Sequence, residues 1–363
     1  MQAKFLLLCL LLISLEAHSQ SMPHEELLCS LDLDLHESSG LLQWNDSTWI
    51  TINDGGGKSE LYFFDGPSGE IVRIAKLIRA SNIDWEALAF GPNGDLYVGD
   101  FGNNLNRRRD LCIYRISSKQ LEEKYLNPEV ISFRFAGQRE FPPSLSAWHY
   151  DIEAMVVMED FIYLFSKNRA RPFNGYVYVY QLPNSVGEQQ AEVIDSLFLG
   201  LDGVREEFWI SAADFIRDEA TLLLLSYQRL FVIKGWPAAS LSDSQMEQYR
   251  FSALRQRESL VSRGRFVYLT EEGNGDHRAH FYRVDLRADT MYLLENQVDT
   301  AVRLKGFSSL PARLGFEIFD QLGKRVKYGL ENDTIHGRFF RHFDIGDLPP
   351  SEYVLFIRLA EHK

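Results

Sequence analysis

The sequence of 363 residues predicts an all-β protein, a five-bladed β-propeller followed by a small C-terminal antiparallel β-sandwich. Two observations predict this fold. Short strand-like runs are separated by turn residues along almost the whole chain, and one element recurs every 47 to 67 residues or so. In each copy a polar residue precedes a small residue and an apolar run, as in the inner strand of a propeller blade. The five polar residues that align are Ser39, Glu86, Glu153, Ser211 and Glu258.

Residues 1–20 are predicted to be a signal peptide and not part of the fold. Lys4 supplies a positive start, residues 5–15 are almost wholly apolar, and small residues for cleavage follow near Ser19. The apolar run is too short to span a bilayer, and no later stretch reaches that length. We therefore expect an exported protein, secreted or held at the cell surface, with no transmembrane segment.

The formal net charge of −13 argues against nucleic acid or an anionic membrane as the main partner. It suits a protein that binds divalent cations, although an acidic surface can also serve only solubility. We expect a monomer. Cys29 and Cys112 lie in strand-like runs about two blades apart, so we expect free thiols and no disulfide.

The propeller is expected to occupy residues 21–290, with turn clusters between its strands. The expected strands, blade by blade, are 39–42, 49–52, 61–64 and 71–77; 85–90, 96–98, 111–116 and 130–135; 152–158, 161–165, 176–181 and 191–198; 210–216, 221–225, 230–234 and 249–254; and 259–261, 266–270 and 279–286. Residues 238–246 could form a short helix. The fifth blade lacks a strand, which residues 27–35 supply most simply, because joining the chain ends removes an exposed sheet edge. Six blades, with residues 291–305 as extra strand material, is the alternative.

The hydrophobic pattern changes around residues 287–300, and residues 291–363 are expected to form the second domain. Their strand-like runs are 314–320, 325–328, 339–343 and 353–359. Such runs, with turn residues between the first two, predict a small antiparallel β-domain.

Propeller geometry predicts that the five aligned polar residues ring the central channel. Three carboxylates, Glu86, Glu153 and Glu258, would then lie close together and repel one another unless a cation binds. The hydroxyls of Ser39 and Ser211 would complete a set with only oxygen donors, which favours calcium over transition metals. Alternatively, a glutamate at the start of such a strand only hydrogen-bonds backbone groups of the next blade.

The long loops expected on the same face are rich in side chains that bind anions. Arginine forks suit phosphate or carboxylate, so we expect a small anionic ligand here, unless these are ordinary solvated turns. The candidate substrate-binding residues are Asn53, Asp100, Asn103, Asn104, Arg107, Arg109, Lys167, Arg169 and Arg278.

The aligned Ser, Glu, Glu, Ser, Glu series over residues 36–262 resembles the central calcium site of the calcium-activated nucleotidases, the soluble apyrases. The resemblance implies calcium-dependent hydrolysis of nucleotides or other phosphate esters, with Asp54 and Glu271 as candidates for managing the attacking water. The alternative is a non-catalytic surface propeller in which calcium is structural and the loops bind a glycan or a protein.

The tail resembles the type A sorting domain of the type IX secretion system. The matching residues are 316–326 and 343–350, followed by 353–357. The resemblance implies passage across an outer membrane with the type IX machinery as partner. A plain β-sandwich appendage is the alternative.

Overall fold

The computed structural model describes residues 25–273, 277–286, 290–298, 301–319, 324–344 and 354–361. The expected signal peptide lies outside the described residues, as do positions 320–323 and 345–350 of the expected sorting domain. The chain divides into two compact units, Met22–Arg287 and a second that contains Ala288–Lys363. Among the described residues, no helix is long and apolar enough to cross a membrane.

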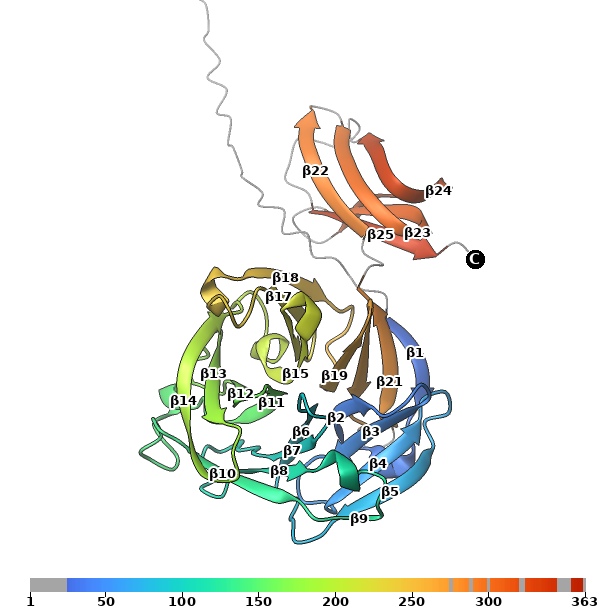
Figure 1. Cartoon of the computed structure of the whole chain (residues 1–363). Helices are drawn as coiled ribbons and strands as arrows, with labels where there is room; N and C mark the ends of the chain where they lie inside the picture. The colour runs from blue at the N-terminus through green and yellow to red at the C-terminus, as the bar shows by residue number, and fades with distance from the viewer. Residues whose placement is uncertain are drawn as a thin grey trace, which may run out of the picture. The chain divides into compact units, whose positions relative to one another are not determined.

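The first unit is an all-β propeller, as predicted (Figure 1). Its inner strands contact one another in a closed ring, in the order β2, β6, β11, β15, β19 and back to β2. These five strands are β2 (Ser38–Gln43), β6 (Trp85–Phe90), β11 (Ile152–Val157), β15 (Ile210–Ile216) and β19 (Arg257–Arg263). Each begins one four-stranded group, and we call these groups blades one to five.

The outer strands follow each inner strand in sequence order. They are β3 (Thr48–Asn53), β4 (Glu60–Asp65) and β5 (Ile71–Leu77); β7 (Leu96–Asp100), β8 (Cys112–Ile116) and β10 (Glu129–Phe135); β12 (Phe161–Ser166), β13 (Tyr176–Pro183) and β14 (Gly187–Phe198); β16 (Thr221–Ser226), β17 (Arg229–Lys234) and β18 (Gln245–Arg250); and β20 (Phe266–Glu271) and β21 (His280–Asp285). Two parallel pairings join neighbouring blades at the rim: β10 with β14, and β5 with the short strand β9 (Tyr125–Leu126).

Strand β1 (Glu25–Ser30) pairs antiparallel with β21 and completes blade five, so the predicted closure by the N-terminal segment is confirmed. A buried ion pair secures it, because the guanidinium of Arg257 donates to Glu25 Oε1 at 2.6 Å and 2.9 Å. The described residues of this unit contain no α-helix but six 3-10 turns: Leu33–Leu35, Ser118–Gln120, Leu145–Ala147, Arg205–Phe208, Arg217–Glu219 and Leu241–Asp243. The helix considered for residues 238–246 is therefore wrong, because β18 already begins at Gln245.

The core lies between adjacent blades. The strands alternate their side chains, and each blade packs its apolar face against the next. Between blades two and three, for example, Phe101, Ile113 and Phe133 pack with Ile152 and Leu164 in one buried cluster. Cys29 and Cys112 are free, as expected.

The second unit is an antiparallel sheet, in agreement with the predicted antiparallel β-domain. Strand β23 (Ala301–Phe319) pairs with β22 (Thr290–Val298), β24 (Arg325–Asp344) and β25 (Val354–Glu361). Strand β22 covers part of the segment in which extra blade material was considered, and it pairs within this unit.

Candidate metal centre and its surroundings

A β-bulge presents the ring residue in four of the five inner strands. The pairing of each inner strand with its neighbour skips one residue, and the skipped residues are Glu86, Glu153, Ser211 and Glu258. In β2 the skip falls at Gly40, directly after Ser39. A bulge re-aims the extra side chain, which here allows it to reach the channel.

The three ring glutamates line one small cavity of about 10 Å³ in the channel. This is room for about one water-sized particle. The serines are otherwise engaged: Ser39 Oγ donates to the carbonyl of Glu86 at 2.8 Å, and Ser211 Oγ donates to the carbonyl of Arg257 at 2.5 Å. Both hydroxyls thus bond the backbone of the next blade.

A lysine lies between two of the glutamates. Lys167 Nζ is 2.8 Å from Glu153 Oε2, 3.7 Å from Glu258 Oε1 and 3.0 Å from the hydroxyl of Tyr227. Burial lowers the pKa of Lys167, but the two carboxylates outweigh it and hold that pKa well above its ordinary value. Lys167 is therefore a permanent cation within the ring.

Arg169 adds a second cation to the same blade. Its guanidinium donates to Asp151 through Nε, and its Nη2 lies 3.5 Å from Glu153 Oε1. It also stacks on the ring of Trp209 at 4.8 Å. About 20% of the Arg169 side chain stays exposed, so it is less deeply buried than Lys167, at 4%.

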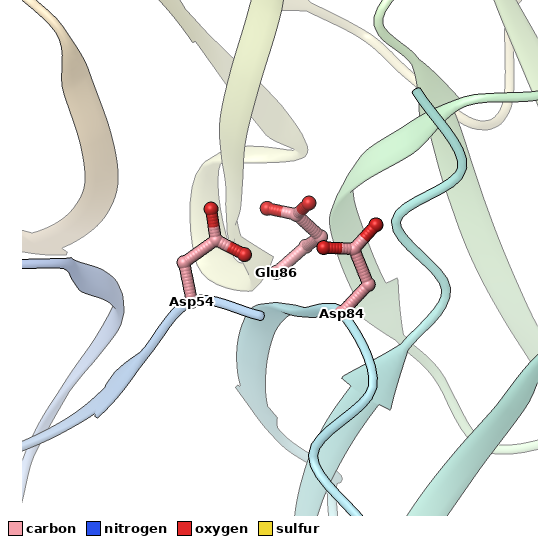
Figure 2. A group of neighbouring side chains, drawn as sticks. All are labelled: Asp54, Asp84 and Glu86. Atoms are coloured by element: carbon pink, nitrogen blue, oxygen red, sulfur yellow. The ribbon is translucent and has the colours of Figure 1, made fainter. Parts of the chain in front are cut away.

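The other side of the ring gathers three carboxylates, and no cation among the described residues forms an ion pair with them. Oxygens of Asp54, Asp84 and Glu86 lie within 4.8 Å of one another, and Figure 2 shows the three groups gathered around a common space. Two ligand oxygens of one calcium ion can be at most about 4.8 Å apart, roughly twice the calcium–oxygen bond length. The spacing is therefore compatible with one shared cation.

Within the described part of the chain, no hydrogen-bond donor reaches the carboxylate oxygens of Asp84 or Glu86, and Glu86 is only 3% exposed. Burial, followed by the charges of Asp54 and Asp151, raises the pKa of Asp84 to about 7. Burial and the charge of Glu153 also raise the pKa of Glu86 well above its ordinary value. Binding a cation would relieve this cost, because an unpaired buried charge is unfavourable.

Two glycines make room for this cluster. A Cβ on Gly102 would lie 2.3 Å from Glu86 Oε1, and one on Gly55 would lie 2.4 Å from Asp84 Oδ1. Any side chain at either position would displace the carboxylates. The cluster therefore lies in a cradle whose walls are backbone.

The strand register reveals a second set of equivalent positions, one after the second strand of each blade. Asp54 in blade one corresponds to Phe101 in blade two and to Lys167 in blade three, because the residues before them pair equivalently with the inner strands. Tyr227 and Glu272 are the equivalents in blades four and five. Burial, with the charge of Glu258, raises the pKa of Glu272 to about 9.

Sequence reasoning did not single out Asp84, Asp151 or Glu272. A signal for the first two was present, because each stands two residues before a ring glutamate and side chains alternate along a strand. The sequence predicts Glu271 as a site residue, but it is the neighbouring Glu272 that lies near the ring carboxylates. Glu271 is directed instead toward the outer strand, where it accepts hydrogen bonds from the hydroxyl of Tyr282 at 2.6 Å and from Arg255 at 3.2 Å.

The remaining predicted residues fall into two groups. Asp100, Asn103 and Asn53 hold loops: Asp100 pairs with Arg108 at 2.8 Å, Asn103 Oδ1 accepts the N–H groups of Arg107 and Arg108, and Asn53 Nδ2 donates to the carbonyl of Asp34. The others are exposed, and within the described part of the chain they make no contact with the three carboxylates. They are Asn104, Arg107, Arg109 and Arg278.

No family model and no curated protein matches the chain. Solved structures with a similar fold include a gluconolactonase from Xanthomonas campestris, 12% identical, with a TM-score of 0.40, covering 74% of this chain and 91% of its own. Another is an exo-β-1,3-galactanase from Phanerochaete chrysosporium, 10% identical, with a TM-score of 0.45, covering 93% of this chain and 98% of its own. These similarities concern the fold alone.

Proposed function

We propose that the propeller is a calcium-dependent hydrolase of small anionic esters, with phosphate esters as the substrate class. The observation that supports this is the convergence of Asp54, Asp84 and Glu86 next to the cations of blade three. No ion pair within the described part of the chain compensates these three carboxylates. Carboxylate-only donors favour a hard cation, and adaptable geometry favours calcium over magnesium. Bound calcium would polarise the ester and make a coordinated water more acidic.

The protein's own residues have separate roles in this proposal. Asp54, Asp84 and Glu86 hold the cation. Arg169, oriented by Asp151 and Trp209, directs its guanidinium group to the anionic group of the substrate. Glu272, with its pKa raised to about 9, holds a proton at neutral pH and can donate it to a leaving-group oxygen.

Phosphate release from a panel of nucleotides and other phosphate esters, with calcium and with chelator, tests the proposal. We expect calcium-dependent release that Asp84→Asn reduces by about two to three orders of magnitude, the scale of losing charge stabilisation at a reacting centre. Asp46→Asn is the matched control, since the Asp46 side chain is 97% exposed. If folded protein released phosphate from none of the compounds, the proposed hydrolase activity would be wrong.

One observation favours a second candidate function, a binding propeller in which calcium is structural. Asp54 follows β3 of blade one, whereas Asp84 and Glu86 belong to blade two, so one cation would join two blades. In that case calcium would raise the melting temperature without supporting turnover. The loops around the channel mouth would then bind a glycan or a protein.

Export remains a proposal from the sequence alone. We propose that residues 1–20 direct export and that residues 291–363 engage the type IX secretion machinery, which would place the propeller outside the cell. Fractionation of cells that express the full chain or a chain ending at residue 290 tests this. Equal export of both chains would show that residues 291–363 are not needed for export.

A further inference from the structure

We propose that the ammonium group of Lys167 occupies the place of a second cation in the ring, so that the propeller binds a single divalent ion. Neutralising Lys167 then opens a second divalent-cation site between Glu153 and Glu258. The inference deepens the proposed function, because it takes Asp54, Asp84 and Glu86 as the first site. It assigns Lys167 as the residue that sets the number of metal ions.

The contacts of Lys167 are those of an ion held by oxygen ligands. Its ammonium group reaches Glu153 at 2.8 Å, the hydroxyl of Tyr227 at 3.0 Å and Glu258 at 3.7 Å, and its side chain is only 4% exposed. Tyr227 in turn donates to Glu258 Oε1 at 2.9 Å. Three oxygen groups from three blades thus surround one positive charge, as they would surround a metal ion.

The position of Lys167 in the register explains why only one half of the ring is compensated in this way. The equivalent residue of blade one is Asp54, and that of blade five is Glu272. The equivalent residue of blade two, Phe101, is fully buried in the core between blades two and three. Lys167 is therefore the one cation among these five equivalent positions, and it serves the glutamates of blades three and five.

The residues around Lys167 would suit a divalent cation once its charge is removed. Glu258 Oε2 is buried without a hydrogen-bond partner, and both Glu153 and Glu258 border the cavity of about 10 Å³. Only oxygens are available, which again selects a hard cation. Arg169 would remain engaged with Asp151 and lie 3.5 Å from Glu153, so its single positive charge would face the three carboxyl groups of Asp151, Glu153 and Glu258.

Calorimetric titration with calcium alone tests the inference on the wild-type full chain, Lys167→Met and Lys167→Arg. We expect one site in the wild type, two in Lys167→Met and one in Lys167→Arg, which keeps the charge. Equal stoichiometry in the wild type and Lys167→Met would overturn the inference.

Other outcomes separate this inference from the proposed function. If the wild type binds no calcium and Lys167→Met binds one ion, the Asp54 site fails and the role of Lys167 stands. Lys167→Met removes one partner of a buried pair, so its folding is itself informative. Folding only with calcium would support the inference, whereas failure to fold with or without calcium would overturn it.

Discussion

Blades two and three carry the same motif but compensate its charge differently. Asp84-Trp85-Glu86 and Asp151-Ile152-Glu153 occupy equivalent positions, and both place the glutamate at a bulge. In blade three, Lys167 and Arg169 neutralise the pair. In blade two, Phe101 and Asn103 stand at the equivalent loop positions. The inner strand therefore places the carboxylates, and the loop after the second strand decides whether the protein or a ligand neutralises them.

This difference has an energetic consequence. A buried carboxylate with a hydrogen-bonded cation is compensated when the chain folds, whereas an unpaired one costs free energy until something binds. Blade three thus supplies its own cations, and these offset only part of the burial that holds the pKa of Glu153 well above its ordinary value. In blade two the buried carboxylates repel one another, and a bound cation would remove this cost. Such a gain on binding is what a cation site requires.

The largest expected effect comes from breaking the compensated half. Glu153→Gln leaves Lys167 and Arg169 with one fewer carboxylate, and we expect a loss of about 3 kcal/mol in the free energy of unfolding in chelator. Denaturant unfolding measures it. A change below about 1 kcal/mol would show that Lys167 relies mainly on Glu258 and Tyr227.

Crowding the carboxylates of blade two with a methyl group is the next test. Asn168 stands in blade three where blade two has Gly102, and Gly102→Ala places a methyl group 2.3 Å from Glu86 Oε1. The side chains can move aside, so we expect the fold to persist while calcium loses its stabilising effect, about 2.7 kcal/mol at a hundredfold excess over Kd. Gly57→Ala is the matched control, because its nearest atoms lie at 3.6 Å. If calcium stabilised Gly102→Ala as much as the wild type, calcium would not bind at this cluster.

The same substitution should have the opposite sign in the two blades. Glu86→Gln replaces a buried carboxylate, to which no described residue donates a hydrogen bond, by a neutral amide. We therefore expect a gain of about 1–2 kcal/mol in the free energy of unfolding in chelator at pH 8.5. With calcium present, the gain should become a loss. Thermal melts in both conditions, compared with those of Glu153→Gln, show whether the signs differ. Equal signs would contradict the asymmetry between the blades.

The sequence predicts part of this arrangement because strand periodicity is local. The repeat identifies Glu86, Glu153 and Glu258 as channel residues, and the structure places all three around one cavity. The same periodicity would have given Asp84 and Asp151, since both lie two residues earlier. The sequence does not predict which groups Lys167 contacts. A loop side chain can face an anionic substrate or a neighbouring blade, and only tertiary packing decides between them. Glu271 and Glu272 differ by one position, which in a strand reverses the direction of the side chain.

The smallest expected effect is on the pH dependence of stability, and it depends on Asp84. The pKa of Asp84 is raised from 3.8 to about 7, so the folded chain binds more protons than the unfolded chain between these values. Stability from this group is complete below about pH 4 and is lost as the pH rises toward 7. Because Asp84 is only partly buried, we expect the loss between pH 5.5 and pH 7.5 in chelator to be about 0.5–1 kcal/mol.

Asp84→Asn should lower that slope by this amount and leave the contributions of Glu86 and Glu272, whose pKa values are also raised, as denaturant unfolding at several pH values can show. Calcium should reverse it in the wild type, because metal binding requires the ionised carboxylate and its stabilising effect therefore grows as the pH rises. A slope that is unchanged in Asp84→Asn would assign the whole titration to the other buried carboxyls, with Glu272 the next to test because its pKa is raised to about 9. The slope thus reports whether blade two, in the absence of metal, holds a proton where blade three holds the ammonium of Lys167.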